Sequence, residues 1–324
     1  MSAPAPDTGT PSRLRIGIDL GGTKTEGIVM AADGGILTRL RRPTPQQQGY
    51  DAVLENIREL VRALEQAAGG PCRVGIGTPG AISTRSGLLK NSNTVCLNGR
   101  PVQQDLQALL QRELRIANDA NCFALSEARD GAAAGAAVVF GVILGTGVGG
   151  GIVVRGQLVE GAQHIAGEWG HNVLEPDGPA CYCGRRGCVE TFLSGPGLLR
   201  DYRSHGGEAA IDTHEIVARA VTGDVRATAA MQRYLARFGR ALATVINILD
   251  PDVVVLGGGM SSLDALYGEG IKHLARHVFD AVGPAAGPED LADAVATLRQ
   301  RVCRNRHGDS SGVRGAAQLW NAAE

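Results

Sequence analysis

The stretch EWGHNVLEPDGPACYCGRRGCVE at residues 168–190 concentrates the chemistry around which this chain is organised. Three cysteines and one histidine lie within eighteen residues of sequence: His171, Cys181, Cys183 and Cys188. Three thiolates and an imidazole are the ligands of a tetrahedral Cys3His zinc site. Gly184 and Gly187 would let the backbone turn sharply between the ligands. The sequence therefore predicts a structural zinc ion held by these four side chains.

The cysteines also allow three other interpretations: a disulfide pair, buried free thiols or a catalytic zinc. A Cys-x-Cys disulfide closes a strained ring, and the chain shows no secretory signal. A catalytic zinc usually keeps one position open for water, whereas four protein ligands close the coordination shell. Two acids, Glu168 and Glu190, bracket the cluster. A structural zinc would hold these two carboxylates and His171 in a fixed relation.

Length and composition predict the number of domains and argue against a nucleic-acid-binding protein or a disulfide-rich one. A length of 324 residues predicts about two domains. The 32 basic and 33 acidic residues give a net charge of −1, so we expect no nucleic-acid partner. Seven cysteines, three of them in the cluster, fit a reducing compartment better than a disulfide framework.

Two segments could be mistaken for targeting or membrane signals. Residues 1–14 lack a basic start and an apolar centre, so we expect a disordered tail rather than a signal peptide. Residues 131–154 carry no charge and are long enough to span a bilayer, but eight of them are glycine. Two buried strands, at 138–144 and 151–154, joined by a glycine loop explain this pattern better. We therefore expect a cytoplasmic protein without a membrane partner.

A glycine turn follows the first predicted strand. Residues 15–20 form a mostly apolar strand that contains Asp19, and residues 26–30 form the returning strand. The tip of this hairpin would present backbone N–H groups and a hydroxyl to the oxygens of a polyphosphate. Asp19 could hold Mg²⁺ through water. An ordinary turn is the alternative interpretation of these candidate nucleotide-binding residues: Asp19, Gly21, Gly22, Thr23 and Lys24.

Two further glycine turns follow later in the chain. The second joins the strands predicted within residues 131–154, and the third follows an apolar strand at 253–256 and could lie flat against an adenine. Repeated glycine turns suggest two half-domains that both offer backbone N–H groups to one ligand. The additional candidate nucleotide-binding residues are Gly145, Thr146, Gly147, Gly149, Gly150, Gly258 and Gly259.

Asp119 lies where a short strand at 114–117 gives way to a helix that runs from Asn118 to Gly131. An acid at a helix start is commonly only an N-cap. The junction of a strand and a helix is also where α/β sheets bind ligands, so Asp119 could act as a general base. Gly80 lies in the turn that follows a strand at 73–77.

Apolar periodicity predicts the remaining elements. We expect helices at 50–68, 102–111, 193–202, 213–220, 228–249 and 316–321. Residues 294–302 are less regular and predict neither a helix nor a strand.

Together, these motifs resemble the ROK family of bacterial sugar kinases and repressors. The matching stretches are DLGGTK at 19–24, NDAN at 118–121, LGTGVGGG at 144–151, EWGH at 168–171, CYCGRRGCVE at 181–190 and GGG at 257–259. Within the family, the chain looks most similar to the proteobacterial fructokinases (manno-fructokinases), and the N-acetylglucosamine kinases look nearly as similar.

The resemblance implies an actin-like ATPase (ribonuclease H-like) fold, with two α/β domains around a cleft. The N-terminal domain would comprise residues 15–122 and 308–324, and the C-terminal domain residues 123–307 with the zinc site. ATP would lie across the glycine loops with Mg²⁺. Asp119 would take the proton of the attacking hydroxyl, and the sugar would be bound by Gly80, Asn118, Asp119, Glu168, His171 and Glu190.

The function expected from this resemblance is a fructokinase that converts D-fructose and ATP to fructose 6-phosphate and ADP. N-acetylglucosamine kinase or glucokinase activity is the alternative, because one sugar substituent is discriminated by pocket shape alone. A ROK repressor would need a helix-turn-helix region before residue 15, where no helical pattern is present. A sensor without catalysis would lack Asp119 or a phosphate loop. The family also implies a homodimer.

Overall fold

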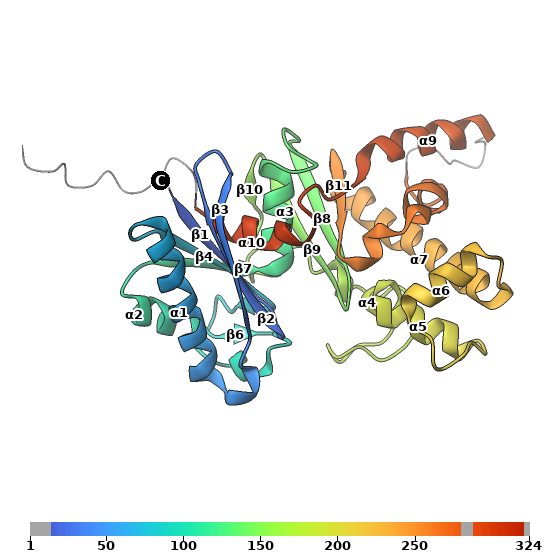
Figure 1. The fold of residues 1–324 in the computed structure, drawn as a ribbon. Helices are drawn as coiled ribbons and strands as arrows, with labels where there is room; N and C mark the ends of the chain where they lie inside the picture. The colour runs from blue at the N-terminus through green and yellow to red at the C-terminus, as the bar shows by residue number, and fades with distance from the viewer. Residues whose placement is uncertain (1–13, 280–287, 321–324) are drawn as a thin grey trace, which may run out of the picture. The chain divides into compact units, whose positions relative to one another are not determined.

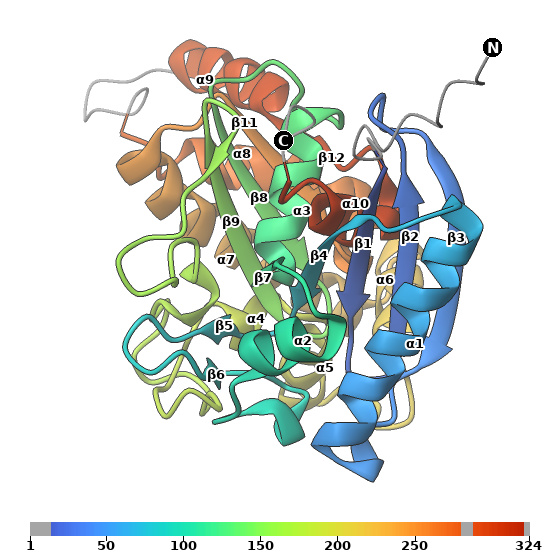
Figure 2. The same ribbon diagram turned by 90° about the vertical axis from the view of Figure 1, so that its left-hand side faces the viewer.

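The computed structural model describes residues 14–279 and 288–320, which form two compact α/β units (Figures 1 and 2). The first unit comprises the chain through Cys122 together with Ala162–His164 and the residues from Ser310 onwards. The second comprises Phe123–Gly161 and Ile165–Asp309. Residues 1–13 of the expected tail and residue 321 of the expected terminal helix lie outside the described residues.

The first unit is built on a five-stranded mixed sheet with the order β3-β2-β1-β4-β7. Its strands are β1 (Arg15–Leu20), β2 (Lys24–Met30), β3 (Ile36–Pro43), β4 (Arg73–Thr78) and β7 (Leu114–Asn118). The predicted hairpin is confirmed, because β1 and β2 pair antiparallel with Asp19 opposite Glu26. β4 and β7 run parallel to β1. A two-stranded ribbon of β5 (Ala81–Ile82) and β6 (Leu89–Lys90) lies outside this sheet.

Helices cover both faces of the first sheet. Helices α1 (Tyr50–Ala68) and α2 (Val102–Leu110) share a hydrophobic core with Ile16, Ile18 and Leu20 of β1. Side chains alternate along a strand, so Gly17 faces the other side. A Cβ on Gly17 would lie only 2.1 Å from the Val313 carbonyl oxygen, so glycine is required for helix α10 (Ser311–Ala317) to pack there. Short 3-10 turns lie at Gln46–Gln48 and Val95–Leu97.

The second unit repeats this sheet topology, in the order β10-β9-β8-β11-β12. The strands are β8 (Val138–Leu144), β9 (Val148–Val154), β10 (Gln157–Leu158), β11 (Val253–Gly257) and β12 (Val302–Arg304). In both sheets an antiparallel meander supplies three strands, and two later strands add in parallel. The doubled topology is consistent with an actin-like ATPase fold.

The uncharged residues 131–154 contribute an antiparallel hairpin, as predicted. Strand β9 begins at Val148 rather than at residue 151, so Gly149 and Gly150 belong to the strand and pair with Ile143 and Val142. The expectation that they lie in the turn is wrong, because their backbone groups pair with β8 and this pairing needs no side chain. In the described ranges, no helix has both the length and the apolar character needed to cross a membrane.

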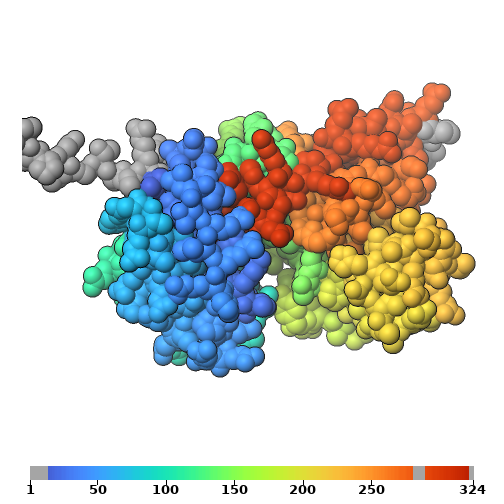
Figure 3. Space-filling model, viewed as in Figure 1, coloured from blue at the N-terminus to red at the C-terminus, as the bar shows by residue number. Residues whose placement is uncertain are grey.

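Helices pack around the second sheet, and α7 (Val225–Leu249) lies in the centre of its core with Tyr234, Phe238 and Leu242 buried. The other helices are α4 (Glu190–Leu193), α5 (Gly195–Ser204), α6 (Thr213–Val221), α8 (Ile271–Ala275) and α9 (Pro288–Arg301). Helix α3 (Asp119–Arg129) begins in the first unit and continues into the second. The yellow segment with α5 and α6 lies at the surface of the second unit (Figure 3).

The expectation that residues 294–302 are irregular is wrong. Helix α9 extends through Arg301, and Val302 then starts strand β12, whose partner is Val254 of β11. A three-residue strand is too short for a periodic signal, and its partner lies about fifty residues earlier. Short turns of 3-10 or π-helix lie at Trp169–His171, Gly259–Ser262, Leu266–Gly270 and Gly308–Ser310.

Candidate functional site

The four predicted metal ligands come together in the second unit. The ligand atoms of His171, Cys181, Cys183 and Cys188 all lie within 4.8 Å of one another. The distance from His171 Nδ1 to Cys181 Sγ is 3.6 Å, and that from Cys183 Sγ to Cys188 Sγ is also 3.6 Å. A tetrahedral zinc ion with usual bond lengths has ligand–ligand edges of about 3.6–3.8 Å. The donor set therefore fits a four-coordinate zinc ion, and these two distances match the edges of its coordination tetrahedron.

The backbone of the metal-binding loop turns at the two predicted glycines. Gly184 and Gly187 have φ angles of +87° and +66°, in the left-handed region that favours glycine. The Cys181 N–H donates to the Arg185 carbonyl at 2.8 Å, which closes the turn between the ligands. Burial alone would raise the pKa of the Cys183 thiol, but hydrogen bonds from Arg185 outweigh it and lower the pKa to about 6. All seven cysteines are free thiols, so the disulfide interpretation is not supported.

A tyrosine that sequence reasoning missed completes the surroundings of His171. The second ring nitrogen, Nε2, lies 3.0 Å from the Tyr182 hydroxyl, and the two rings pack edge to face with centroids 5.1 Å apart. Metal-binding histidines commonly use the free nitrogen for such a contact. The sequence signal was an aromatic residue between two cysteine ligands.

The two acids that bracket the cluster are held next to the β8–β9 turn. The Val148 N–H donates to Glu190 Oε2 at 3.0 Å, and a Cβ on Gly147 would lie 2.6 Å from the same oxygen. Glu168 is half-buried and precedes the turn Trp169–His171. A Cβ on Gly170 would lie 2.1 Å from the Val148 carbonyl oxygen. The predicted residues Glu168, His171, Glu190 and Gly147 therefore share one neighbourhood.

A cavity of about 820 Å³ opens in the second unit beside two of the glycine turns. Its rim includes the predicted residues Gly145, Thr146 and Gly259. Gly258, with φ +80°, packs against the end of β8, where a Cβ would lie 2.4 Å from the Leu144 carbonyl oxygen. Gly149 and Gly150 do not line this cavity.

Sequence reasoning missed the apolar wall of the cavity. It includes Val217, Met231, Leu235, Met260 and Leu263. Each looks like an ordinary core residue in its own helix or turn, and only the packing of α6, α7 and the Gly259–Ser262 turn reveals their shared face. An apolar cavity with polar groups at its rim is the usual form of a small-molecule site.

In the first unit, Asp119 lies at the start of α3 with two other predicted residues. The Ala120 N–H is 2.9 Å from Asn118 Oδ1 and 2.8 Å from Asp119 Oδ1. Asn118 Nδ2 donates to the Gly80 carbonyl at 3.2 Å. Gly80 has φ +86°, and a Cβ there would lie 2.3 Å from the Lys90 carbonyl oxygen. The structure thus brings Gly80, Asn118 and Asp119 together.

Asp19 is a half-buried acid close to Asp119. Burial, followed by the charges of Asp119 and Glu26, raises the pKa of Asp19 to about 7, against the opposing effect of Lys24. Neighbouring carboxylates that are kept from water favour a bound cation or a proton. The pair therefore fits the expected place of a divalent ion.

The first glycine turn keeps its tip open. The Gly21 N–H donates to the Lys24 carbonyl at 3.0 Å, and the Thr44 hydroxyl donates to the Gly21 carbonyl at 2.7 Å. Thr23 and Lys24 are exposed, whereas Gly21 and Gly22 are half-buried. This turn can therefore offer a hydroxyl and an ammonium group to an anionic ligand.

Comparisons with known proteins identify the family of this chain. The model of the ROK family matches residues 15–323. N-acetyl-D-glucosamine kinase of Yersinia pseudotuberculosis serotype O:1b is 39% identical over 313 residues, covering 94% of this chain and 97% of that protein. The N-acetyl-D-glucosamine kinase of Escherichia coli O9:H4 is also 39% identical, over 94% and 98% of the two chains.

Solved structures agree as well. The ROK hexokinase from Thermus thermophilus is 31% identical with a TM-score of 0.75, covering 94% of this chain and 96% of that one. The ROK family glucokinase from Streptomyces griseus, in complex with glucose and AMPPNP, is 28% identical with a TM-score of 0.73, over 94% and 98% of the two chains. The Yersinia and Escherichia relatives are N-acetyl-D-glucosamine kinases and not fructokinases, so the expected greater likeness to fructokinases is not confirmed. The chain belongs to the ROK family.

Proposed function

We propose that this protein transfers the γ-phosphoryl group of ATP to N-acetyl-D-glucosamine. The chain is an ATP-dependent hexose kinase, since it belongs to the ROK family and shares 39% identity with N-acetyl-D-glucosamine kinases over 94% of its length. The observation that carries the chemistry is the pair of neighbouring half-buried acids, Asp19 and Asp119, beside the first glycine turn.

In this proposal Asp119 is the general base. Its carboxylate accepts the proton of the sugar hydroxyl as the oxygen attacks the γ-phosphorus, and the bond to the β-phosphate oxygen breaks to release ADP. Asp19 would help to hold Mg²⁺, and the ion would neutralise phosphate charge when bound. Phosphoryl transfer requires mainly positioning and charge stabilisation, and both are properties of these residues.

The other roles in this proposal come from the family resemblance and are supported by the surroundings of each residue. The glycine turns at 21–24 and 145–147 bind phosphate oxygens, and the apolar cavity beside Gly145 and Gly259 takes the adenosine. Sugar hydroxyls are bound by Gly80, Asn118, Glu168, His171 and Glu190. His171 and the three cysteines would hold a structural zinc, which stabilises the loop between Glu168 and Glu190 when bound.

The sugar is the finer part of the proposal. N-acetyl-D-glucosamine is the first candidate because the curated relatives act on it. Fructose is the second, because the motif Glu168-Trp-Gly-His-Asn172 resembles that of fructokinases. A homodimer stays a prediction, which light scattering would test.

A panel of hexoses tests the proposal. ADP formation would be followed with Mg-ATP and N-acetylglucosamine, fructose, glucose or mannose, and kcat/KM compared. We expect the highest value for N-acetyl-D-glucosamine. A higher kcat/KM for fructose would contradict the proposed sugar but not the kinase activity. No ADP formation with any hexose would contradict both the sugar and the activity.

A further inference from the structure

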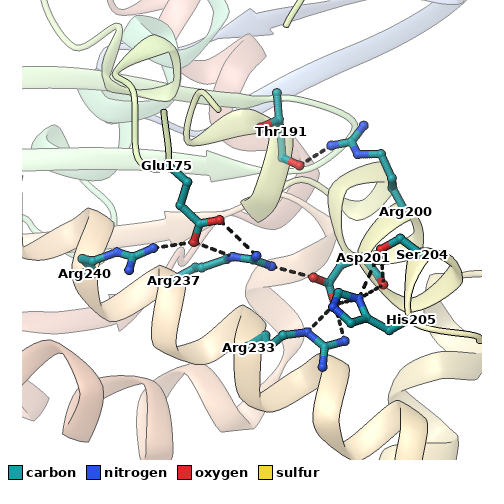
Figure 4. Close-up of polar contacts among 9 residues, drawn as sticks. All are labelled: Glu175, Thr191, Arg200, Asp201, Ser204, His205, Arg233, Arg237 and Arg240. Atoms are coloured by element: carbon teal, nitrogen blue, oxygen red, sulfur yellow. Dashed lines mark hydrogen bonds and ion pairs between the residues drawn. The ribbon is translucent and has the colours of Figure 1, made fainter. Parts of the chain in front are cut away.

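A network of ion pairs ties the metal-binding loop of the second unit to two helices (Figure 4). Arg237 of α7 lies in its centre. Its Nε and Nη2 contact Glu175 Oε1 and Oε2 at 2.9 and 3.1 Å, and its Nη1 contacts Asp201 Oδ1 of α5 at 2.6 Å. The side chains of Arg237 and Asp201 are 17% and 10% exposed, so water screens this contact only weakly. The two-point contact of Arg237 with Glu175 fixes the relative orientation of the two side chains as well as pairing their charges.

Glu175 belongs to the loop that carries the metal ligands, four residues after His171. Its N–H donates to the Gly187 carbonyl at 3.2 Å, and its own carbonyl accepts from Gly178 at 2.9 Å. Gly187 directly precedes the ligand Cys188, and a Cβ on Gly187 would lie 1.5 Å from the Glu175 carbonyl oxygen. The Glu175 backbone therefore joins both ends of the metal-binding loop, and its side chain joins that loop to Arg237.

The same guanidinium reaches the helix that carries Glu190. Arg237 Cζ lies 4.4 Å from the centre of the buried Phe192 ring, which is two residues beyond Glu190 in α4. A Cβ on Gly178 would lie 2.6 Å from Phe192 Cζ, so the ring packs between the metal-binding loop and Arg237. Arg200 of α5 also donates to the Thr191 carbonyl of α4.

We propose that Arg237 is a positioning residue that holds the metal-binding loop with His171 and the helix with Glu190 in one fixed arrangement, and thereby sets the affinity for the sugar. The inference rests on the proposed function, because it takes His171 and Glu190 as sugar-binding residues. Arg237 acts through Glu175 and Phe192 and is not itself a catalytic residue.

Two neighbouring arginines provide matched controls. Nε and Nη2 of Arg233 contact Asp201 Oδ2 at 2.9 and 2.6 Å. In the described part of the chain, Arg233 has no such contact with Glu175 or with the Phe192 ring. Arg240 contacts Glu175 Oε1 at 2.5 Å, but its side chain is 45% exposed. Loss of either arginine removes one ion pair of the network and leaves the contacts of Arg237 to Glu175 and Phe192.

The experiment compares Arg237→Met with Arg233→Met and Arg240→Met in the full chain. For Arg237→Met we expect about a 10-fold rise in the KM for sugar, with the KM for ATP within about 2-fold, because the cavity beside Gly145 is built from other residues. Zinc release to a coloured chelator should be about 10-fold faster, as expected when an outer partner of a metal site is lost. Both control variants should stay within about 3-fold of wild type in each measurement.

Two further arms make the result decisive. Arg237→Lys keeps the charge but not the two-point contact, so it should fall between wild type and Arg237→Met. If Arg237→Met does not fold, Glu175→Gln replaces it, because it weakens the same contact without removing a partly buried arginine. Zinc release is measured without sugar, so it tests whether Arg237 holds the metal-binding loop even if no hexose is phosphorylated, and the sugar KM tests the effect on sugar affinity. Zinc release and sugar KM in Arg237→Met equal to those in Arg233→Met would overturn the inference.

Discussion

The Tyr182 hydroxyl lies 3.0 Å from Nε2 of His171, while Nδ1 of the same ring lies 3.6 Å from Cys181 Sγ. A histidine that binds a metal through Nδ1 must carry its proton on Nε2. That proton is then donated to the Tyr182 oxygen, and the edge-to-face packing of the two rings fixes their orientation. The Tyr182 hydroxyl is thus placed to accept the Nε2 proton when Nδ1 binds the metal.

Tyr182→Phe should weaken zinc binding while leaving the four ligands in place. The ring packing remains, but the hydrogen bond between Nε2 and the Tyr182 hydroxyl is lost. We expect about a 10-fold loss of zinc affinity, at the low end of the range for such partners. Competition with a chelator measures it, and thermal unfolding of the zinc-loaded variant controls for the fold. Equal zinc affinity in the two proteins would mean that the cysteines alone orient His171.

Cys181→Ser or Cys183→Ser should remove the zinc altogether. A serine hydroxyl is a poor substitute for a thiolate, and the loop between the ligands contains little packed core of its own. Because metal binding supplies local folding free energy, the variants should also unfold at a lower temperature. Elemental analysis of protein purified without chelator provides the test, with Cys303→Ser, outside the cluster, as the control. One zinc per chain in Cys181→Ser, or none in the wild type, would contradict the assignment.

The cavity beside Gly145 and Gly259 should respond to a substitution that fills it. A substitution in the glycine turn itself, such as Gly147→Val, would not test the nucleotide site alone, because the new side chain would also displace Glu190. Val217→Trp instead places an indole in the cavity, and Val225→Trp is the control, because Val225 is 82% exposed and does not line it. We expect the KM for ATP to rise about 10-fold in Val217→Trp only, with sugar KM unchanged. An unchanged KM for ATP would place the adenosine elsewhere.

The sequence predicted those features that local pattern determines. The spacing of Cys181, Cys183 and Cys188 predicts the cluster, and the apolar stripe of residues 50–68 predicts α1 with its bounds. Strand β3 was missed because Arg39, Arg41 and Arg42 give an edge strand with no apolar run. Glu26 lies on the neighbouring strand, and its side chain is only 3% exposed. It forms ion pairs with Arg39 and Arg41, and these contacts exist only once β2 and β3 have come together in the sheet.

Other features depend on contacts that no local window contains. The wall of the cavity combines side chains of α6, α7 and the Gly259–Ser262 turn, each of which looks like ordinary core by itself. The link from Glu175 to Arg237 spans 62 residues. Spacing rules predict the metal ligands because a metal site in one loop is local, whereas a cavity between helices is not.

The raised pKa of Asp19 should make the stability of the ligand-free protein depend on pH. Its pKa is about 7 in the folded state, against 3.8 for an ordinary aspartate, so the folded protein binds this proton more tightly. The contribution of Asp19 is therefore fully present below pH 3.8 and is lost as pH rises towards and through about 7. The total loss is at most about 4 kcal/mol.

Asp19→Asn should remove this pH dependence. Urea unfolding at pH 5 and pH 8, without added Mg²⁺, should show that the wild type loses more stability than the variant between the two values. The comparison of the two differences cancels the titrating groups that do not interact with Asp19. The same variant should lose kinase activity, since it lacks the proposed Mg²⁺ partner. Equal pH dependence in both proteins would mean that Asp19 keeps an ordinary pKa.

Asp119→Asn separates a general base from a helix cap. The Ala120 N–H already has two acceptors, Asn118 Oδ1 and Asp119 Oδ1, and an asparagine at 119 would still offer an oxygen in the same place. The variant should therefore fold, retain zinc and bind sugar and ATP, because asparagine caps helices about as well as aspartate.

The chemical step should respond differently to this substitution. An amide cannot accept the proton of the attacking hydroxyl, so kcat should fall by about 10²- to 10⁴-fold, the usual contribution of a general base. Loss of the Asp119 charge should also lower the pKa of Asp19, since that charge helps to raise it. A cap alone predicts near-normal turnover. Steady-state kinetics decide between the two roles, because a kcat within a few-fold of wild type would show that the hydroxyl loses its proton to another group.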